Sequence, residues 1–219
     1  TQSRSSAASD VYKRQDCTIR SAEWWAPREP TDHAGDKKVT VGIPTFNRPK
    51  DAVAALYALA EDPEVDEVID AIIMPDQGTK HPADESGYAE ITEHFGDRFF
   101  EFRQGNLGGS GGYSRIMYEA LGDKTPDSPY IVYMDDDIAI EPDSILRALQ
   151  VSRYATTPML VGGQMLNLQE RSHLHSMGEV IDRHTFMWTS APHVHYDHNF
   201  AKHPLSDQGK FDDKPDAPN

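Results

Sequence analysis

The stretch YIVYMDDD, residues 130–137, joins five mostly apolar residues directly to three consecutive aspartates. The apolar run has the β-branched and aromatic composition of a strand, so the carboxylates fall at the end of that strand. Three negative charges crowded at the edge of a sheet repel one another unless a cation is bound there. Hard oxygen ligands suit Mg²⁺ or Mn²⁺, which hold few protein carboxylates and share the phosphates of a substrate such as a nucleotide diphosphate. The alternative is a solvated acidic turn before a helix that begins near Pro142.

Outward from this stretch, strand-like and helix-like segments alternate along the chain. The expected strands are residues 39–43, 68–74, 99–102 and 130–134, and the expected helices are residues 49–60, 85–95, 113–121 and 144–154. Pro49 fits the first position of a helix, where its missing N–H costs nothing. Strands separated by helix-length segments predict an α/β fold with a mostly parallel sheet and helices on both faces.

Every loop that follows an expected strand carries chemically distinctive residues. These loops are PTFNR (44–48), DQG (76–78), NLGGSGG (106–112) and the triple aspartate (135–137). Ligands of such sheets bind beyond the carboxyl ends of the strands, where successive loops meet. The sequence therefore predicts that the four loops converge on one ligand site.

The first two of these loops offer groups for the parts of a nucleotide. Thr45, Phe46 and Arg48 supply a hydroxyl, a stacking face and a fixed cation, which suit a ribose, a base and a phosphate. Asp76 has the chemistry to accept a hydrogen bond from a base or a ribose. The residues 75–78 are equally good at forming a plain Asx turn, and the sequence does not choose between the two interpretations.

The glycine-rich loop precedes an expected helix, where bare backbone N–H groups can face negative charge. Its spacing matches neither the dinucleotide fingerprint nor the P-loop, because it lacks the following acidic residue of the first and the Gly-Lys-Ser/Thr ending of the second. A flexible turn without ligand contacts remains the alternative for this loop taken alone.

Composition bounds the class of protein. At 219 residues the chain is long enough for one α/β domain. A net charge of -15 argues against nucleic acid as a partner, since that binding needs clustered Lys and Arg. No stretch has the length and apolarity of a membrane span, and Cys17 is the single cysteine, so we expect a soluble cytoplasmic protein without disulfides.

Four segments are expected along the chain. Residues 1–15 are predicted to be a disordered leader foreign to the fold, and residues 16–38, with Trp24-Trp25, an extended connector. Residues 39–205 form the predicted ligand-binding core, and residues 206–219 a truncated polar tail. We interpret Asp212-Asp213 in this tail as solvated linker.

Longer motifs resemble a known family. The runs IPTFNRP (43–49), GNLGGSGG (105–112), YMDDDI (133–138), EPDSILRA (141–148) and MLVGGQMLNL (159–168) resemble family 2 glycosyltransferases with the GT-A fold, and among them the galactofuranosyltransferases that polymerise cell-wall galactan. The resemblance implies UDP-galactofuranose as donor, Mn²⁺ or Mg²⁺ as cofactor, and inversion at the anomeric carbon. The implied metal ligands are Asp135 and Asp137. The implied donor-binding residues are Pro44, Thr45, Phe46, Arg48, Asp76, Gln77, Gly78, Asn106, Gly109, Asp135 and Asp136.

The same resemblance implies that His175, Glu179 and Trp188 lie near the acceptor, a galactan chain on a lipid carrier. For these three residues a strand-edge histidine, a surface glutamate and a core tryptophan are the ordinary alternatives. The family's general base lies in a later acidic pair that is expected beyond Asn219, so this chain is expected to be a fragment, inactive by itself, without the N-terminal β-rich domain and the part that closes the site. Peripheral attachment to the inner membrane face and self-association are expectations for the full-length protein.

Other functions stay open at this point. The fold and the triple aspartate do not choose the sugar, so a transferase using dTDP-rhamnose is an alternative, as is a non-catalytic module that binds nucleotide sugars. A dedicated zinc site at His193, His195 and His198 is not expected, because structural zinc sites usually include cysteine and Cys17 is remote in sequence.

Overall fold

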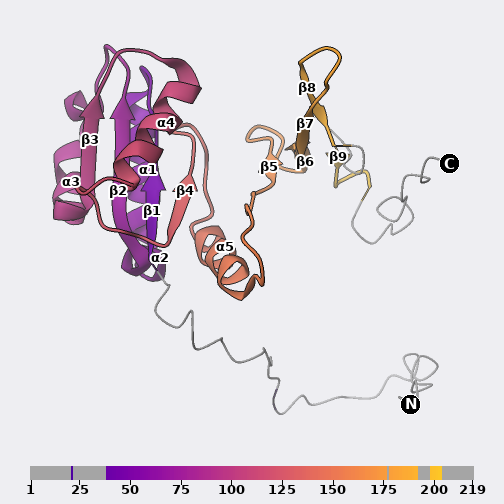
Figure 1. Cartoon of the computed structure of the whole chain (residues 1–219), viewed down its shortest axis with the longest axis horizontal. Helices are drawn as coiled ribbons and strands as arrows, with labels where there is room; N and C mark the ends of the chain where they lie inside the picture. Colours follow the sequence, from indigo (N-terminus) through magenta and orange to yellow (C-terminus); the bar gives the residue numbers. More distant parts are fainter. Residues whose placement is uncertain (1–20, 22–37, 177, 192–197, 204–219) are drawn as a thin grey trace.

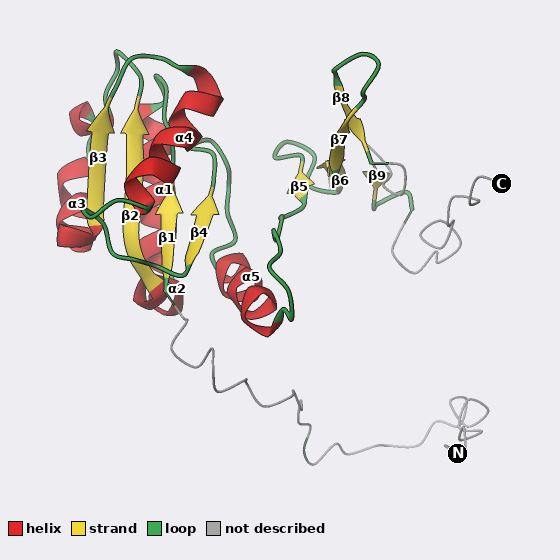
Figure 2. Cartoon of the chain, viewed as in Figure 1, coloured by secondary structure: helices red, strands yellow, loops and turns green. Residues whose placement is uncertain are grey.

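The computed structural model describes residues 21, 38–176, 178–191 and 198–203. Its centre is a four-stranded parallel sheet in the order β3-β2-β1-β4 (Figures 1 and 2). The strands are β1 Val39–Gly42, β2 Ile69–Asp76, β3 Phe99–Arg103 and β4 Tyr130–Tyr133. The chain steps outward from β1 to β3 and then returns to the other side of β1. Open α/β sheets bind their ligands where the strand order reverses, which here is between β1 and β4.

Helices cover both faces of this sheet, as the sequence predicts. They are α1 Pro49–Glu61, α2 Pro63–Val68, α3 Tyr88–Phe95, α4 Gly108–Ala120 and α5 Asp143–Tyr154, with 3-10 turns η3 Pro82–Asp84 and η4 Gly96–Arg98. The helices α1, α2, α3 and α5 contribute to one apolar cluster, and α4 contributes to a second one.

The two clusters separate because side chains of a strand alternate between its faces. On β2, Ile72 joins the larger cluster with Leu56 and Leu59 of α1, and all three are fully buried. Its neighbour Ile73 faces the other way and packs with Ile116 of α4. Burying each of these side chains stabilises the fold by roughly 1.5–3 kcal/mol.

The helix α4 lies unusually close to the sheet. A Cβ atom built on Gly42 of β1 would come within 2.3 Å of Ile116 Cγ2. One built on Gly112 would come within 2.6 Å of Pro44 Cβ. The two glycines let the helix cross directly over the end of β1, so its amino-terminal turn reaches the edge where the strand order reverses.

The structure differs from the expectation at several elements, among them α3, which begins at Tyr88 rather than at residue 85. The helix α2 lies mostly in residues 61–67, for which no element was expected; Asp62 caps it by accepting from Glu64 N at 2.9 Å, and Pro63 opens it. The strand β2 continues through Asp76 instead of ending at residue 74, because Thr45 pairs with Asp76. The helix α4 begins at Gly108, so most of the expected glycine-rich loop is its first turns.

The carboxyl-terminal part forms small antiparallel sheets. The strands β5 Met165–Leu166, β6 His173–Ser176 and β9 His198–Asn199 make one, and β7 Glu179–Ile181 pairs with β8 Trp188–Ser190 in a hairpin. In Figure 2 these strands stand apart from the parallel sheet, beyond α5.

Several expectations fall outside the described residues. These are the leader, nearly all of the connector with Trp24-Trp25 and Cys17, the polar tail with Asp212-Asp213, and two of the histidines, His193 and His195. Among the helices of the described part, none combines the length and the apolarity that crossing a bilayer requires.

Candidate functional site

The loops after β1 and β2 are held side by side by backbone pairing. Beyond the end of β1, Thr45 N donates to Pro75 O and Gln77 N donates to Thr45 O, both at 3.0 Å. The parallel ladder thus extends into the PTFNR loop. This pairing fixes the position of Phe46 and Arg48 at the edge of the sheet. Phe46 is 47% exposed there.

A side-chain amide locks the same two loops further out. Asn47 Oδ1 accepts from Thr79 N at 2.8 Å, from Lys80 N at 3.0 Å and from Thr79 Oγ1 at 3.2 Å. Asn47 has a left-handed backbone, with φ of 56°. A Cβ atom on Gly78 would lie 2.7 Å from Asn47 N, so the DQG loop needs glycine there.

A second amide joins the loop after β2 to the start of α4. Gln77 is buried, and its Nε2 donates to Gly108 O at 3.1 Å. Its Oε1 accepts from Leu107 N at 3.0 Å and from Gln104 Nε2 at 3.2 Å. Gln77 is therefore engaged with protein groups, and it positions the glycine-rich turn.

The triple aspartate follows β4, which ends at Tyr133, and Asp136 and Asp137 form a turn. Asp135 and Asp137 are exposed, whereas Asp136 between them is buried, as expected when side chains alternate. Arg48 Nη1 lies 3.0 Å from Asp137 Oδ2, so an ion pair connects the loop after β1 to the turn after β4. The Tyr113 hydroxyl of α4 donates to Asp135 Oδ1, and burial, followed by this hydrogen bond, raises the pKa of Tyr113.

The inward-facing Asp136 meets the buried Thr45. Neither Asp136 Oδ2 nor Thr45 Oγ1 has a hydrogen bond of regular geometry among the described residues. Burial raises the pKa of Asp136 above its ordinary value of 3.8, while Thr45, Arg48 and the N–H of Phe46 partly oppose that rise. Two buried polar atoms with spare hydrogen-bonding capacity point to a ligand or water between β1 and β4.

We expect Asp136→Asn to raise the Tm at pH 7 by about 1–3 °C. A carboxyl group whose pKa is raised by folding stabilises the fold below its ordinary pKa, and loses that contribution as the pH rises through the folded pKa. The gain stays small because Arg48 and Thr45 favour the ionised form. Thermal unfolding of both proteins from pH 4 to pH 8 checks this, and a gain that is equally large at pH 4 would contradict it.

Two outward carboxylates at this turn are chemically suited to a divalent cation. Asp135 and Asp137 are exposed and offer hard oxygen atoms; Asp135 contacts Tyr113 of α4, and Asp137 contacts Arg48, whose charge suits phosphate. Within the described residues, no group of three or more His, Cys, Asp and Glu side chains is arranged to hold a metal ion. Ligand oxygens would have to complete the coordination, as is usual for Mg²⁺ bound with a nucleotide.

The Asx-turn alternative for Asp76 is what the structure shows. Asp76 Oδ1 accepts from Gly78 N at 2.9 Å, and Oδ2 lies 2.5 Å from His81 Nδ1. The side chain is fully buried. A direct contact between this carboxylate and a base would require His81 to move.

Two further candidates lie at the start of α4. Asn106 is exposed, and its Oδ1 accepts from Gly108 N at 2.9 Å. A Cβ atom on Gly109 would have no neighbour within 4 Å, unlike one on Gly112. This open space above Gly109 leaves room for a ligand to approach the backbone.

The residues expected near an acceptor lie on the antiparallel strands. Glu179 and Trp188 share the β7–β8 hairpin, where Trp188 pairs with Ile181, two residues beyond Glu179. His175 lies on β6, and Ser176 Oγ next to it donates to Glu179 Oε1 at 2.9 Å. Trp188 is 51% exposed, so it is not a core tryptophan. The structure gathers these three residues near one another but does not bring them to the donor-side loops (Figure 1).

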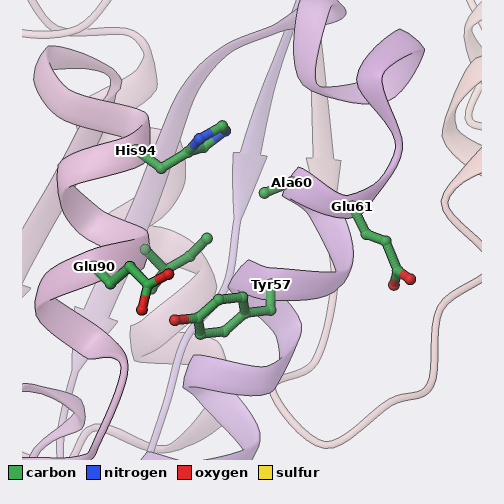
Figure 3. Close-up of a pocket in the computed structure, with 6 residues that line it drawn as sticks. Tyr57, Ala60, Glu61, Glu90 and His94 are labelled. Atoms are coloured by element: carbon green, nitrogen blue, oxygen red, sulfur yellow. The ribbon is translucent and has the colours of Figure 1, made fainter.

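A separate pocket of about 330 Å³ lies between α1 and α3. Figure 3 shows Tyr57 and Ala60 of α1 facing Glu90 and His94 of α3, while the side chain of Glu61 points away from α3. On α1 its lining comes from the later turns, and on α3 it comes from Glu90, Ile91 and His94. It is not part of the candidate site.

Sequence reasoning missed three residues that shape the site: Asn47, His81 and Tyr113. Asn47 could have been found from the sequence, because asparagine readily adopts a left-handed backbone conformation and its amide can hydrogen-bond to a neighbouring loop. The contacts of His81 and Tyr113 depend on the tertiary structure.

Comparison with known proteins identifies the class. Residues 40–180 match the family model described as "Glycosyl transferase family 2", so the chain belongs to this glycosyltransferase family. The parallel sheet and its flanking helices agree with the GT-A fold of such enzymes.

Two galactofuranosyltransferases are similar in sequence to this chain over most of its length. The chain is 58% identical over 198 residues to "Galactofuranosyltransferase GlfT2" of Mycolicibacterium smegmatis, and 56% identical over 198 residues to the protein of that name from Mycobacterium tuberculosis. Each match covers 90% of this chain and 30% of the relative.

Proposed function

We propose that this chain is the donor-binding part of a galactofuranosyltransferase that takes galactofuranose from UDP-galactofuranose and adds it to a growing galactan chain. One observation carries the proposal: the PTFNR loop and the triple aspartate meet where the strand order reverses, through Arg48 and Asp137 at 3.0 Å. The likeness to two galactofuranosyltransferases supports the choice of sugar.

In this proposal, different site residues contact different parts of the donor. Phe46 is exposed enough to stack on uracil, and the start of α4 offers backbone N–H groups to the diphosphate. Arg48 stabilises negative charge that develops on the departing UDP. Asp136 and Thr45 have spare capacity for hydrogen bonds to a ribose or donor-sugar hydroxyl.

A divalent cation, Mn²⁺ or Mg²⁺, belongs to the proposal. Asp135 and Asp137 would hold it, and when bound it would neutralise the diphosphate and so assist its departure. Arg48 pairs with Asp137 at 3.0 Å, which keeps the guanidinium beside the place where the phosphates would sit.

The acceptor side of the proposal rests on the hairpin. Trp188 offers an exposed face for a sugar ring, and Glu179 and His175 offer hydrogen bonds to its hydroxyl groups. Attack by the acceptor hydroxyl opposite to the departing UDP would invert the anomeric carbon. A carboxylate base for that hydroxyl is part of the mechanism, and we assign it to no residue of this chain.

Isothermal titration of UDP into the purified chain tests the donor site. We expect binding with Mn²⁺ that weakens at least about a hundredfold in EDTA, because the triple aspartate repels the diphosphate when no cation screens it. Folded protein that binds UDP equally well with and without Mn²⁺, or not at all, would contradict the proposal.

Competition between nucleotides then tests the choice of donor. UDP should displace a fluorescent UDP analogue at lower concentration than dTDP does. Stronger displacement by dTDP would instead favour a rhamnosyltransferase of the same fold. Restored transfer when the rest of a homologous enzyme is supplied in trans would separate a catalytic core from a non-catalytic binding module.

A further inference from the structure

The two loops that carry the proposed donor contacts are not joined by backbone pairing alone. Phe46 and Arg48 flank Asn47, whose side-chain oxygen accepts from Thr79 N and Lys80 N at 2.8 and 3.0 Å. A third donor, Thr79 Oγ1, lies 3.2 Å from the same oxygen. One amide thus satisfies two backbone N–H groups of a loop that lies 32 and 33 residues further along the chain.

The backbone at Asn47 gives this contact a direct consequence for its neighbours. Its φ of 56° lies in the left-handed region, which turns the chain between Phe46 and Arg48. Both neighbours are about half exposed, at 47% for Phe46 and 53% for the Arg48 side chain, so little packing holds either of them. Besides the backbone pairing of Thr45 and the ion pairs of Arg48, the side chain of Asn47 between them is the contact that holds this segment.

The facing loop is shaped to receive the amide. Gly78 leaves the space that Asn47 occupies, because a Cβ atom there would meet Asn47 N at 2.7 Å and Asn47 Oδ1 at 2.9 Å. Asp76 Oδ1 accepts from Gly78 N at 2.9 Å and so turns the following N–H groups toward Asn47. Both loops are therefore built for the same contact.

We infer that Asn47 is a positioning residue for donor binding: its amide holds Phe46 and Arg48 in the orientation in which they meet the base and the diphosphate. The inference rests on the proposed function and adds to it a residue that touches no substrate. Organising these side chains before binding removes part of the ordering cost from the binding step.

Three substitutions of Asn47 distinguish the effect of its side-chain amide from the effect of its left-handed backbone conformation. Asn47→Ala removes the acceptor and disfavours the left-handed turn, whereas Asn47→Gly removes the acceptor and permits the turn. Asn47→Asp keeps an oxygen acceptor and tolerates the turn. Asn167→Ala is the matched control, because Asn167 Oδ1 likewise accepts from Gln169 N and Glu170 N, at 2.9 and 3.0 Å, in the antiparallel region.

The readouts are UDP affinity with Mn²⁺ by isothermal titration, and hydrogen–deuterium exchange of segments 46–48 and 78–80 in the full chain. We expect Asn47→Ala and Asn47→Gly to weaken UDP binding about five- to tenfold and to speed exchange in both segments. Asn47→Asp should return both readouts to within about threefold of the original chain, although its added charge opposes the diphosphate. Asn167→Ala should change neither readout.

The outcomes distinguish this inference from the proposed function. Unchanged UDP binding and exchange in Asn47→Gly would overturn the inference, because the turn alone would then account for any loss in Asn47→Ala. A comparable loss of affinity in Asn167→Ala would also overturn it. Original chain that is folded but fails to bind UDP would contradict the proposed function, while the exchange data would still show whether Asn47 orders the two loops.

Discussion

Asp137→Asn is expected to weaken Mn²⁺-dependent UDP binding by about a hundredfold, which corresponds to about 2.8 kcal/mol. The substitution keeps the shape of the side chain but removes one of the two outward carboxylates proposed to hold the cation. In EDTA the variant should bind UDP at least as well as the original chain does. Removing the negative charge of Asp137 lessens the repulsion of the diphosphate. It also frees Arg48, which lies 3.0 Å from Asp137 in the original chain.

A nearby aspartate provides the control for this experiment. Asp143 in the first turn of α5 is exposed and paired with Arg147, much as Asp137 is paired with Arg48, but it lies outside the proposed site. Titrations of UDP with Mn²⁺ and with EDTA should leave Asp143→Asn indistinguishable from the original chain. Unaltered Mn²⁺-dependent binding in Asp137→Asn would refute the assignment of this carboxylate to the cation.

The second large effect is on the free energy of unfolding. Alanine in place of Gly112 of α4 should lower it, whereas alanine in place of Gly109 should raise it. Gly112→Ala places a Cβ atom 2.6 Å from Pro44 Cβ and 3.1 Å from Gln77 Nε2. Pro44 sits on the end of β1 and has little freedom to retreat, so we expect a loss of about 1–3 kcal/mol in the free energy of unfolding. Because the clash moves α4 off the loop, UDP binding should weaken as well.

Gly109→Ala should stabilise the chain slightly and still impair binding. Its Cβ atom has no neighbour within 4 Å, and alanine favours helix over glycine by up to about 1 kcal/mol. The same methyl group would occupy the space through which we propose the diphosphate approaches α4. Chemical denaturation and UDP titration of both variants check the pair, and a stabilised Gly109→Ala with unaltered UDP affinity would remove Gly109 from the proposed site.

Periodicity and composition were sufficient to predict the parallel sheet and the edge that carries the site. Short apolar runs such as 39–42 and 130–133 each end at polar or glycine-rich residues, and in a parallel sheet these ends lie together. That geometric rule also placed Arg48 near the triple aspartate, which the 3.0 Å ion pair confirms.

Local patterns failed where tertiary contacts decide the conformation. Glycine is a poor helix former, so residues 108–112 looked like a loop, yet they form the first turns of α4, where close packing against Pro44 requires glycine at Gly112. The short helix α2 was hidden because its Val65 and Val68 adjoin the apolar run of β2, although Asp62-Pro63 is a recognisable cap. The engagement of Gln77 with Gln104, Leu107 and Gly108 could not be predicted, since these partners come from another loop, whereas the Asx turn of Asp76 was one of two interpretations that the sequence left open.

The alternation through residues 135–137 sets a rule for how this turn can vary. Exposure alternates from Tyr133 to Asp137, so the outer two acids face solvent and the middle one is buried beside Thr45. Inserting a single residue after Met134 would exchange these directions, leaving one acid outside and two beneath the loop. Side chains at this turn can therefore change identity more freely than the turn can change length.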